Sequence, residues 1–440
     1  SRSSRRTTRV PTAPAAPVIT TVIGTPTIAW TGNHCRGSKL PRPYDAVMSD
    51  DLPPDDFGGM AFLNDLMRLV QAQAGGNNEI VRQLAHSTAS EGRSEPNIDP
   101  VDRIAVEELV RIAELHVTST TGLSVGSSGV SVEVGNRSQW ADRTINDYRP
   151  LFEHLSSALV AGMGQPTDEV SPTDPMAAMM ANLSHLMGPI MLGMMTGSMV
   201  GHLARRALGG YDLPVPRPTG EPVLVLLPNV DDFGRDWSIA SDDLRLWVCL
   251  HEVTHQAVFS VDHVHRRLTD LLERYASAFD TDPERIGRQF GGFDLTAGPD
   301  ALAGLQETLS DPDVLLGAVR SPEQEAIQPE LTALVAAITG YVDWVMDSIG
   351  ETLIGSYSMI TEALRRRRVE AAAGDRFVAR ILGLELNAEQ YDRGTAFTAG
   401  VLERAGTDGL NRLFADPQAL PTPAEIDAPG LWLARIDLPS

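Results

Sequence analysis

The residues of this 440-residue chain whose types and spacing could do chemistry are His251, Glu252 and His255, which form an H-E-x-x-H motif. Residues four apart lie on the same face of a helix, so the two imidazoles would stand one turn apart and could share a metal ion. Glu252 would then lie beside the metal rather than on it. Zinc held by three protein ligands keeps a fourth position for water and lowers the pKa of that water, whose proton Glu252 would accept. The motif therefore indicates a zinc-dependent hydrolase.

The flanking sequence predicts the elements that would position this motif. Ser241, followed by two aspartates, is a favourable helix start with a capping oxygen, so we predict the motif helix at about 242–260. Apolar residues of this helix share a stripe with the two histidines, which predicts that the imidazoles point into the protein. Upstream, the apolar run 222–228 is bounded by prolines and has the length of one buried strand. The alternative interpretation is a pair of core histidines beside a surface glutamate.

A catalytic zinc needs a third protein ligand, and the sequence offers several candidates. The metzincin extension is absent, because valines stand at its two places. We prefer Asp343, on a helix marked by apolar positions between 331 and 345, where Gly340 would allow a neighbour to approach closely. Asp347 follows one turn later and could orient a histidine from behind the ligand shell. A solvated acidic edge is the alternative for this carboxylate pair. The other candidate ligands are Asp347, His263 and His265.

Several longer segments, beyond the motif itself, resemble the actinobacterial zincin-like metallopeptidases. Relatives are also labelled as hydrolases or as proteins associated with deazaflavin-coenzyme biosynthesis. The likeness runs over most of the chain beyond residue 50. It rests on the segments 208–214 (LGGYDLP), 246–250 (LWVCL), 340–343 (GYVD), 364–368 (LRRRR), 382–386 (LGLEL), 420–423 (LPTP) and 427–430 (DAPG).

The resemblance implies a mainly α protein with a small β component and a zincin-like metallopeptidase fold. It also implies Zn²⁺ and a hydrolase without an assigned substrate. Some relatives carry a glutamate where this chain has Thr339, four residues before Asp343. Either Asp343 is the third ligand with Asp347 behind it, which we favour, or the site is weakened. Because some relatives look degenerate at the histidine motif, membership of the family does not establish catalysis.

Composition bounds the cellular setting and the partners. Hydrophobic residues make up 42% of the chain and aromatic residues 5%, as expected for a globular protein with a helical core rich in alanine and leucine. Two cysteines offer no disulfide framework, so we expect a reducing, cytoplasmic location. A net charge of -22 argues against nucleic acid and anionic membranes as partners. The methionine-rich stretch 176–208 has polar interruptions, so we predict no membrane span there.

The first 55 residues differ from the rest of the chain. Residues 1–47 carry seven basic side chains against one acidic side chain, and they show no hydrophobic periodicity. We expect a disordered basic arm followed by an acidic linker, and a helical zincin-like domain over 56–440. The arm has the composition of a transit peptide or a nucleic-acid-binding tail. We favour an over-extended reading of the gene for residues 1–47, because the composition changes abruptly at Met48.

Together these observations predict a zinc-dependent metallopeptidase that acts on a peptide or protein substrate. His251, His255 and Asp343 would hold Zn²⁺, and Glu252 would activate water. Tyr341 and Tyr357 are the candidates for an oxyanion-stabilising donor. The alternative is a non-catalytic scaffold or binding protein with a structural or vestigial metal site. Further helices are expected near 60–73, 77–90, 99–117 and 140–163, with a strand or hairpin in 122–134.

Overall fold

The structure, a computed structural model, describes residues 77–125, 129–162, 193–194, 196–279, 320–369, 381–384 and 387–438. All of them belong to one compact unit, Met60–Ser440. The predictions made for residues 1–55 and for a helix near 60–73 lie outside the described residues, as does most of the methionine-rich stretch.

The described part of the chain is mainly helical with a small β component, which confirms the predicted fold class. Its strands are β1 (Val132–Gly135) and β2 (Val223–Leu226). Short 3-10 helices are η1 (Arg412–Phe414) and η2 (Pro417–Ala419). The α-helices are α2 (Asn77–Ser90), α3 (Pro100–Thr121), α4 (Arg137–Asp147), α5 (Arg149–Gly162), α7 (Leu227–Asp236), α8 (Ser241–Phe259), α9 (Asp262–Ser277), α13 (Pro322–Leu353), α14 (Tyr357–Val369), α16 (Ala388–Asn411), α17 (Pro423–Ile426) and α18 (Pro429–Ile436).

The two strands pair in parallel, with Val132 opposite Val223 and Gly135 opposite Leu226. The run 122–134 therefore contributes a strand that pairs with a distant segment. A hairpin within that run would have paired it locally. All four residues of β2 are buried, as its uninterrupted apolar sequence predicts. The backbone near Gly209 lies antiparallel along β2, bridged to Val225.

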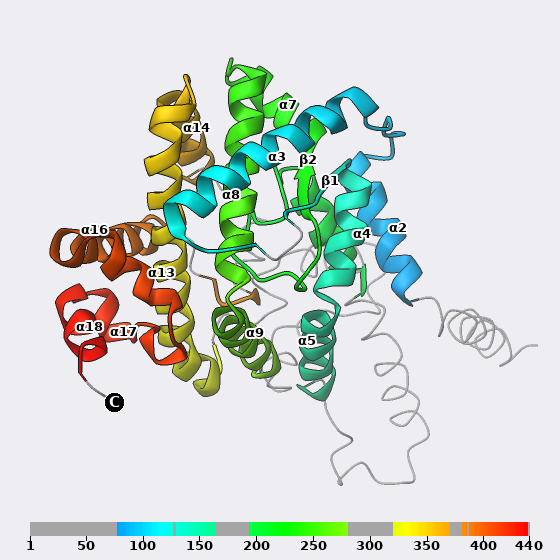
Figure 1. Ribbon diagram of the computed structural model, residues 1–440. Coiled ribbons are helices and arrows are strands. Elements are labelled where there is room, and N and C mark those ends of the chain that lie inside the picture. Colours follow the sequence, from blue (N-terminus) through cyan, green and yellow to red (C-terminus); the bar gives the residue numbers. More distant parts are fainter. Residues whose placement is uncertain are drawn as a thin grey trace, which may run out of the picture. The chain divides into compact units, whose positions relative to one another are not determined.

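Helix α8 occupies the middle of this unit. It packs against α3, α7, α13 and β2, and Figure 1 shows α3 crossing in front of it. This position follows from its sequence, because apolar side chains surround most of the helix and 12 of its 19 residues are buried. Helices that are apolar on several faces need neighbours on several faces.

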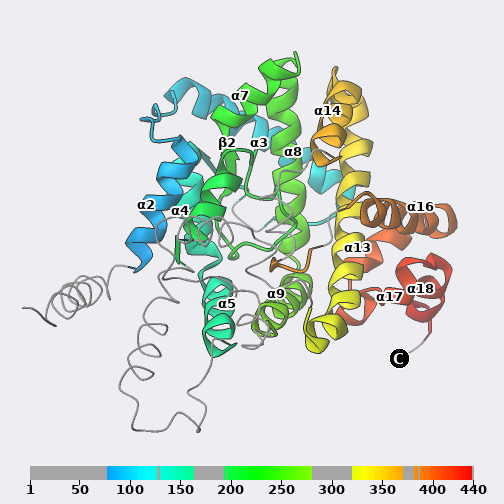
Figure 2. The same cartoon turned by 180° about the vertical axis from the view of Figure 1, so that it is seen from behind.

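The 32-residue helix α13 is the second long support, and it packs against α8, α9 and α16. Figure 2 shows α13 running beside α8, with α16, α17 and α18 on its far side. A Cβ atom on Gly340 would lie 2.2 Å from the carbonyl oxygen of Gly394 on α16. A Cβ atom on Gly394 would lie 2.2 Å from the carbonyl oxygen of Ala336. The prediction that Gly340 allows a close approach is therefore confirmed.

A small polar cluster joins the last two helices, α17 and α18, to each other and to η2. Arg435 donates two hydrogen bonds to the Glu425 carboxylate, at 2.5 and 2.9 Å. The indole of Trp432 is fully buried and donates to the carbonyl oxygen of Ala419 at 2.6 Å. Among the helices that the structure describes, none is long and apolar enough to cross a membrane.

Candidate functional site

Helix α8 carries the H-E-x-x-H motif, but it does not begin as predicted. Its N-cap is Ala240, no side chain caps it, and Ser241 is already helical, so the prediction of a capping serine is wrong. Asp242 and Asp243 do lie in the first turn. Asp243 accepts hydrogen bonds from the backbone N–H and the hydroxyl of Ser356, at 2.8 and 2.7 Å. These bonds fix the start of α8 to the turn that precedes α14.

The two histidines are adjacent, as their spacing predicts, with His255 buried and His251 half-buried. His255 is 3% exposed, the His251 side chain is 14% exposed, and their ring centroids lie 4.4 Å apart. Nδ1 of His255 lies 3.1 Å from the carbonyl oxygen of His251. A carbonyl can accept a hydrogen bond but cannot donate one, so Nδ1 carries the hydrogen and Nε2 of the neutral ring carries the lone pair. Metal-binding histidines commonly use this tautomer.

Aromatic rings hold both imidazoles in place. The Tyr211 ring stacks on His255 with 5.6 Å between centroids and 10° between planes. The Trp247 ring stacks on His251 with 5.0 Å and 17°. Trp247 lies one helical turn before His251, so the sequence of α8 itself supplies this contact. Stacking of this kind restricts the rotation of each imidazole and fixes the direction of its nitrogen atoms.

Glu252 is 1% exposed, which makes the alternative interpretation of a surface glutamate wrong. Its carboxylate accepts hydrogen bonds from the backbone N–H of Gly210 at 2.7 Å and of Tyr211 at 3.1 and 3.2 Å. Oε1 also lies 3.5 Å from Nδ1 of His251. Burial is the largest influence on the pKa of Glu252 and raises it above its ordinary value, although contact with His251 opposes the shift.

The turn that holds Glu252 needs glycine for steric reasons. A Cβ atom on Gly209 would lie 2.4 Å from the Cδ atom of Glu252. The turn is anchored to β2, because the Gly210 N–H also donates to the carbonyl oxygen of Leu224 at 2.9 Å. Trp140 fixes its other side by donating from Nε1 to the carbonyl oxygen of Gly209 at 2.7 Å. The turn and the motif helix therefore form one buried unit.

A buried arginine supports this turn from behind. Arg217 is 5% exposed and donates to the carbonyl oxygen of Gly210 at 2.9 Å and to Asp147 at 2.6 Å. Its guanidinium lies over the rings of Trp140 and Tyr148, 5.9 and 5.2 Å from their centroids. The paired charge and the two aromatic faces compensate for the loss of water around Arg217.

A second arginine fixes the start of the turn. Arg367 donates to Asp212 at 2.7 Å, and Asp212 accepts the backbone N–H of Leu208 at 2.9 Å. Sequence reasoning found neither arginine contact, and it assigned no role to the turn. The available signals were two adjacent glycines after Leu208 and the run of arginines on α14.

The candidates for the third ligand lie on α9 and α13. Asp343 is half-buried on α13. Its negative charge, like that of Asp347, raises the pKa of Tyr357. Asp347, proposed to orient a histidine, instead accepts a hydrogen bond from the Tyr357 hydroxyl at 2.7 Å. His265 Nε2 lies 3.0 Å from the carbonyl oxygen of Arg217. His263, the remaining alternative, precedes it by two residues on α9 and so points to a different side of that helix.

The site provides two candidate zinc ligands, His251 and His255, and a zinc site needs at least three protein ligands. Within the residues that the structure describes, no group of three or more His, Cys, Asp or Glu side chains could hold a metal ion. The structure therefore brings His251, Glu252 and His255 together but does not group Asp343 with the two histidines. The donor type and tautomer of the histidine pair fit zinc, and Asp343 as third ligand stays a prediction.

The two tyrosines proposed as oxyanion donors have other partners. The Tyr341 side chain is fully buried, and its hydroxyl donates to Asn411 at 3.0 Å. The Tyr357 hydroxyl donates to Asp347, and burial is the main reason that its pKa lies above the ordinary value. Tyr211 is the tyrosine that contacts the motif, through its ring on His255 and its backbone N–H on Glu252.

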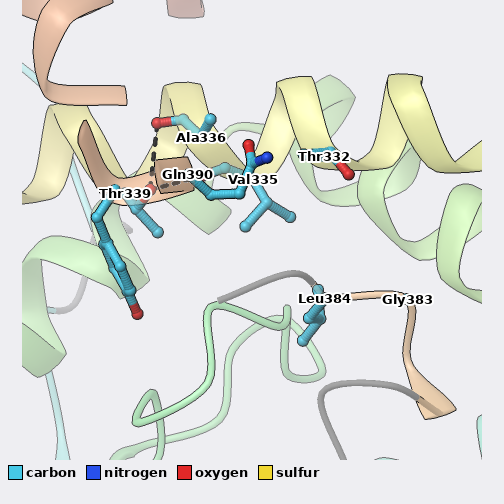
Figure 3. A pocket seen from close by; sticks show the side chains of 8 residues that line it. Thr332, Val335, Ala336, Thr339, Gly383, Leu384 and Gln390 are labelled. Atoms are coloured by element: carbon cyan, nitrogen blue, oxygen red, sulfur yellow. Dashed lines mark hydrogen bonds between the residues drawn. The ribbon is translucent and has the colours of Figure 1, made fainter. Parts of the chain in front are cut away.

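Thr339, which stands where some relatives carry a glutamate, lines a small pocket between α13, α16 and the segment 381–384 (Figure 3). Its hydroxyl donates to the carbonyl oxygens of Val335 and Ala336, at 2.9 and 3.2 Å. A threonine bonded in this way to its own helix cannot replace a carboxylate as a metal ligand. The rest of the lining includes Thr332, Gly383, Leu384 and Gln390.

The protein is mainly helical, and an H-E-x-x-H motif lies on its central helix. The sequence profile of the zincin-like metallopeptidase family matches residues 77–433, and the chain belongs to that family. A solved structure from Chloroflexus aurantiacus, described as a "putative hydrolase with a novel fold", is also similar. The two chains are 23% identical, with a TM-score of 0.53 over 82% of this chain and 99% of the other. At that identity the likeness shows the fold. No curated protein matches the chain.

Proposed function

We propose that this protein is a zinc-dependent hydrolase of the metallopeptidase type. The observation that carries the proposal is the adjacent pair His251 and His255, with ring centroids 4.4 Å apart and Nδ1 of His255 bonded to a backbone carbonyl. Family membership supports the hydrolase class. Both imidazoles are held in a fixed orientation by stacked aromatic rings, as metal-binding histidines require.

In this proposal His251, His255 and Asp343 hold the metal. When bound, zinc would lower the pKa of water and polarise a substrate carbonyl group. Glu252 is the group that would accept and return a proton. The amides of Gly210 and Tyr211 hold its carboxylate in a fixed position, as a positioned general base requires.

The proposed substrate is a peptide or protein, and the proposed location is the cytoplasm. Neither nucleic acid nor a membrane surface is expected as a partner, because a net charge of -22 would repel both. The actinobacterial source and the deazaflavin association remain predictions from sequence resemblance.

Two observations favour the alternative, a non-catalytic scaffold that keeps the fold. Glu252 is 1% exposed, so its carboxylate has little access to water in this conformation. In addition, the described residues do not assemble three ligands. A catalytic zinc site keeps an open position for water, whereas a structural site is closed by protein ligands.

Metal content tests the site directly. We expect about one zinc per chain in the purified protein, and its loss in His251→Ala and His255→Ala, because two remaining ligands rarely hold zinc. His116→Ala on α3 is the matched control and should keep the metal. Asp343→Asn should weaken zinc binding at least about tenfold, whereas Asp347→Asn should not. Full zinc retention after both motif histidines are replaced would contradict the proposal that they bind the metal.

The Glu252→Gln variant tests whether the protein is an enzyme or a non-catalytic scaffold. In an enzyme, zinc should remain while hydrolysis of a peptide library falls about a hundredfold to ten-thousandfold. The glutamine amide would face backbone N–H groups of the turn, so unfolding must be measured alongside and activity compared where both proteins are folded. Zinc-loaded wild type that cleaves no peptide, amide or ester would establish the scaffold.

A further inference from the structure

Helix α3 has apolar residues on two opposite faces. The buried face, Val106, Val110, Ala113 and Val117, belongs to the core, and α3 packs against α8. The exposed set is Val101, Ile104, Ile112 and Leu115, which are 73%, 60%, 40% and 70% exposed. At about 100° per residue, these two stripes are centred on opposite sides of the helix. In Figure 1 the helix lies in front of α8, and in Figure 2 it lies behind.

The outer stripe has the spacing of a helix-packing seam. Its residues follow one another in steps of three and four, which keeps them in a nearly straight line along the helix. They are residues 101, 104, 108, 111 or 112, and 115. A surface helix normally places polar residues opposite its buried face. Four large aliphatic side chains gathered there indicate a surface that another helix covers.

The charges within the seam indicate what covers it. Glu108 and Arg111 occupy its middle and form an ion pair, with side chains 60% and 63% exposed. An antiparallel second copy would bring Glu108 against Arg111 of that copy. It would also bring Ile104 against Leu115, and every contact would occur twice about a two-fold axis. A parallel copy would instead set like charges side by side.

We propose that this protein forms a homodimer through antiparallel pairing of α3 with α3 of a second copy. The seam is self-complementary in charge, as an isologous interface requires. One helix pair covers less than the roughly 800 Å² per partner of a standard stable interface. The dimer is therefore weak, with a dissociation constant on the order of 10 to 100 µM. The proposal does not depend on metal or on catalysis.

Sedimentation equilibrium of the full chain tests the interface. The average mass should rise from 47.5 kDa towards twice that value as concentration passes through this range. Salt near 0.15 M is needed, because it screens the repulsion between two acidic chains. Ile104→Glu with Leu115→Glu should weaken dimerisation at least about tenfold. Leu431→Glu, at a residue 62% exposed on α18, is the matched control and should change nothing.

A charge exchange tests the antiparallel register. Glu108→Arg alone should weaken the dimer, because it faces Arg111 of the second copy. Glu108→Arg combined with Arg111→Glu should restore it. Circular dichroism checks that each variant keeps the wild-type fold. A wild type that stays monomeric at 500 µM, a dimer that survives the Ile104 and Leu115 replacements, or a double exchange as weak as the single change overturns the proposal.

Discussion

Gly209 and the carboxyl group of Glu252 lie in contact without room for a side chain between them. A methyl group on Gly209 would lie 2.4 Å from Cδ of Glu252, well inside van der Waals contact. Neither partner can withdraw easily, because the turn is bonded to β2 and the glutamate is on a buried helix. The site therefore depends on a residue with no side chain as much as on its histidines.

We predict that Gly209→Ala destabilises the protein by about 1 to 3 kcal/mol, as overpacking of a buried and rigid contact does. The measurement is the free energy of unfolding in urea. Gly430→Ala is the control, because its new Cβ atom would lie 3.7 Å from the nearest atom. Equal stability of the two variants would show that the turn is not held against Glu252.

The motif residues could be predicted from the sequence, but the residues that hold Glu252 could not. The spacing of His251 and His255 places both imidazoles on one face of a helix, with Glu252 beside them. The Gly210 and Tyr211 contacts use backbone N–H groups, which every residue other than proline has, so residue type does not reveal them. The buried role of Arg217 could not be predicted from the sequence either, since arginine side chains are usually solvated.

Among the elements, α13 and α16 approach each other through paired glycines. Gly340 and Gly394 face each other's backbones, and the neighbouring residues Ala336 and Thr339 line the pocket of Figure 3. Backbone contact of this kind leaves no space for a methyl group on either helix. The separation of the two helices is consequently set by the glycines.

Gly394→Ala should separate α13 from α16 and lower the free energy of unfolding by about 2 to 4 kcal/mol. The change can be measured by thermal and urea unfolding. The comparison is Gly355→Ala, where a new Cβ atom would lie at an ordinary 3.5 Å from its nearest neighbour. If Gly394→Ala unfolds like the wild type, the helices are not in contact at this position.

Periodicity predicted α2, α3, α8 and α13, but it did not predict every boundary. The helical stretch expected near 140–163 is two helices, α4 and α5, that meet around Tyr148. The strand at 222–228 is present as β2, because a continuous apolar run is distinctive. Its partner was not predictable, since parallel pairing leaves no local turn signal in the sequence.

For the molecule as a whole, the cluster of Glu425 and Arg435 fixes the last helices. Burial alone would raise the pKa of Glu425, but hydrogen bonds from Arg435 and Thr422 lower it below its ordinary value. A lowered pKa means that the folded state holds the charged form more favourably than the unfolded state does. The stabilisation from the Glu425 charge is complete at pH values above the pKa of this glutamate in the unfolded state. It is lost as pH falls through its lower pKa in the folded state.

We therefore predict that Glu425→Gln lowers the free energy of unfolding at pH 7 by about 1 to 3 kcal/mol. The difference from wild type should shrink as pH falls below about 4.3, the ordinary pKa of glutamate. Urea unfolding at several pH values measures it. Glu403→Gln, at a side chain 80% exposed, should have little effect. A difference that is constant with pH would contradict the ionic origin.

The pairing of β1 with β2 also constrains how the site assembles. Val132 and Val223 meet across a long intervening segment, and the turn that holds Glu252 lies along β2. Helix α8 forms from local contacts, whereas the pairing of the strands must first overcome the entropy of closing that loop. The motif helix can therefore exist before its glutamate has an anchor. The turn and both strands precede the motif in the sequence, so the anchor of Glu252 joins segments that lie far apart along the chain.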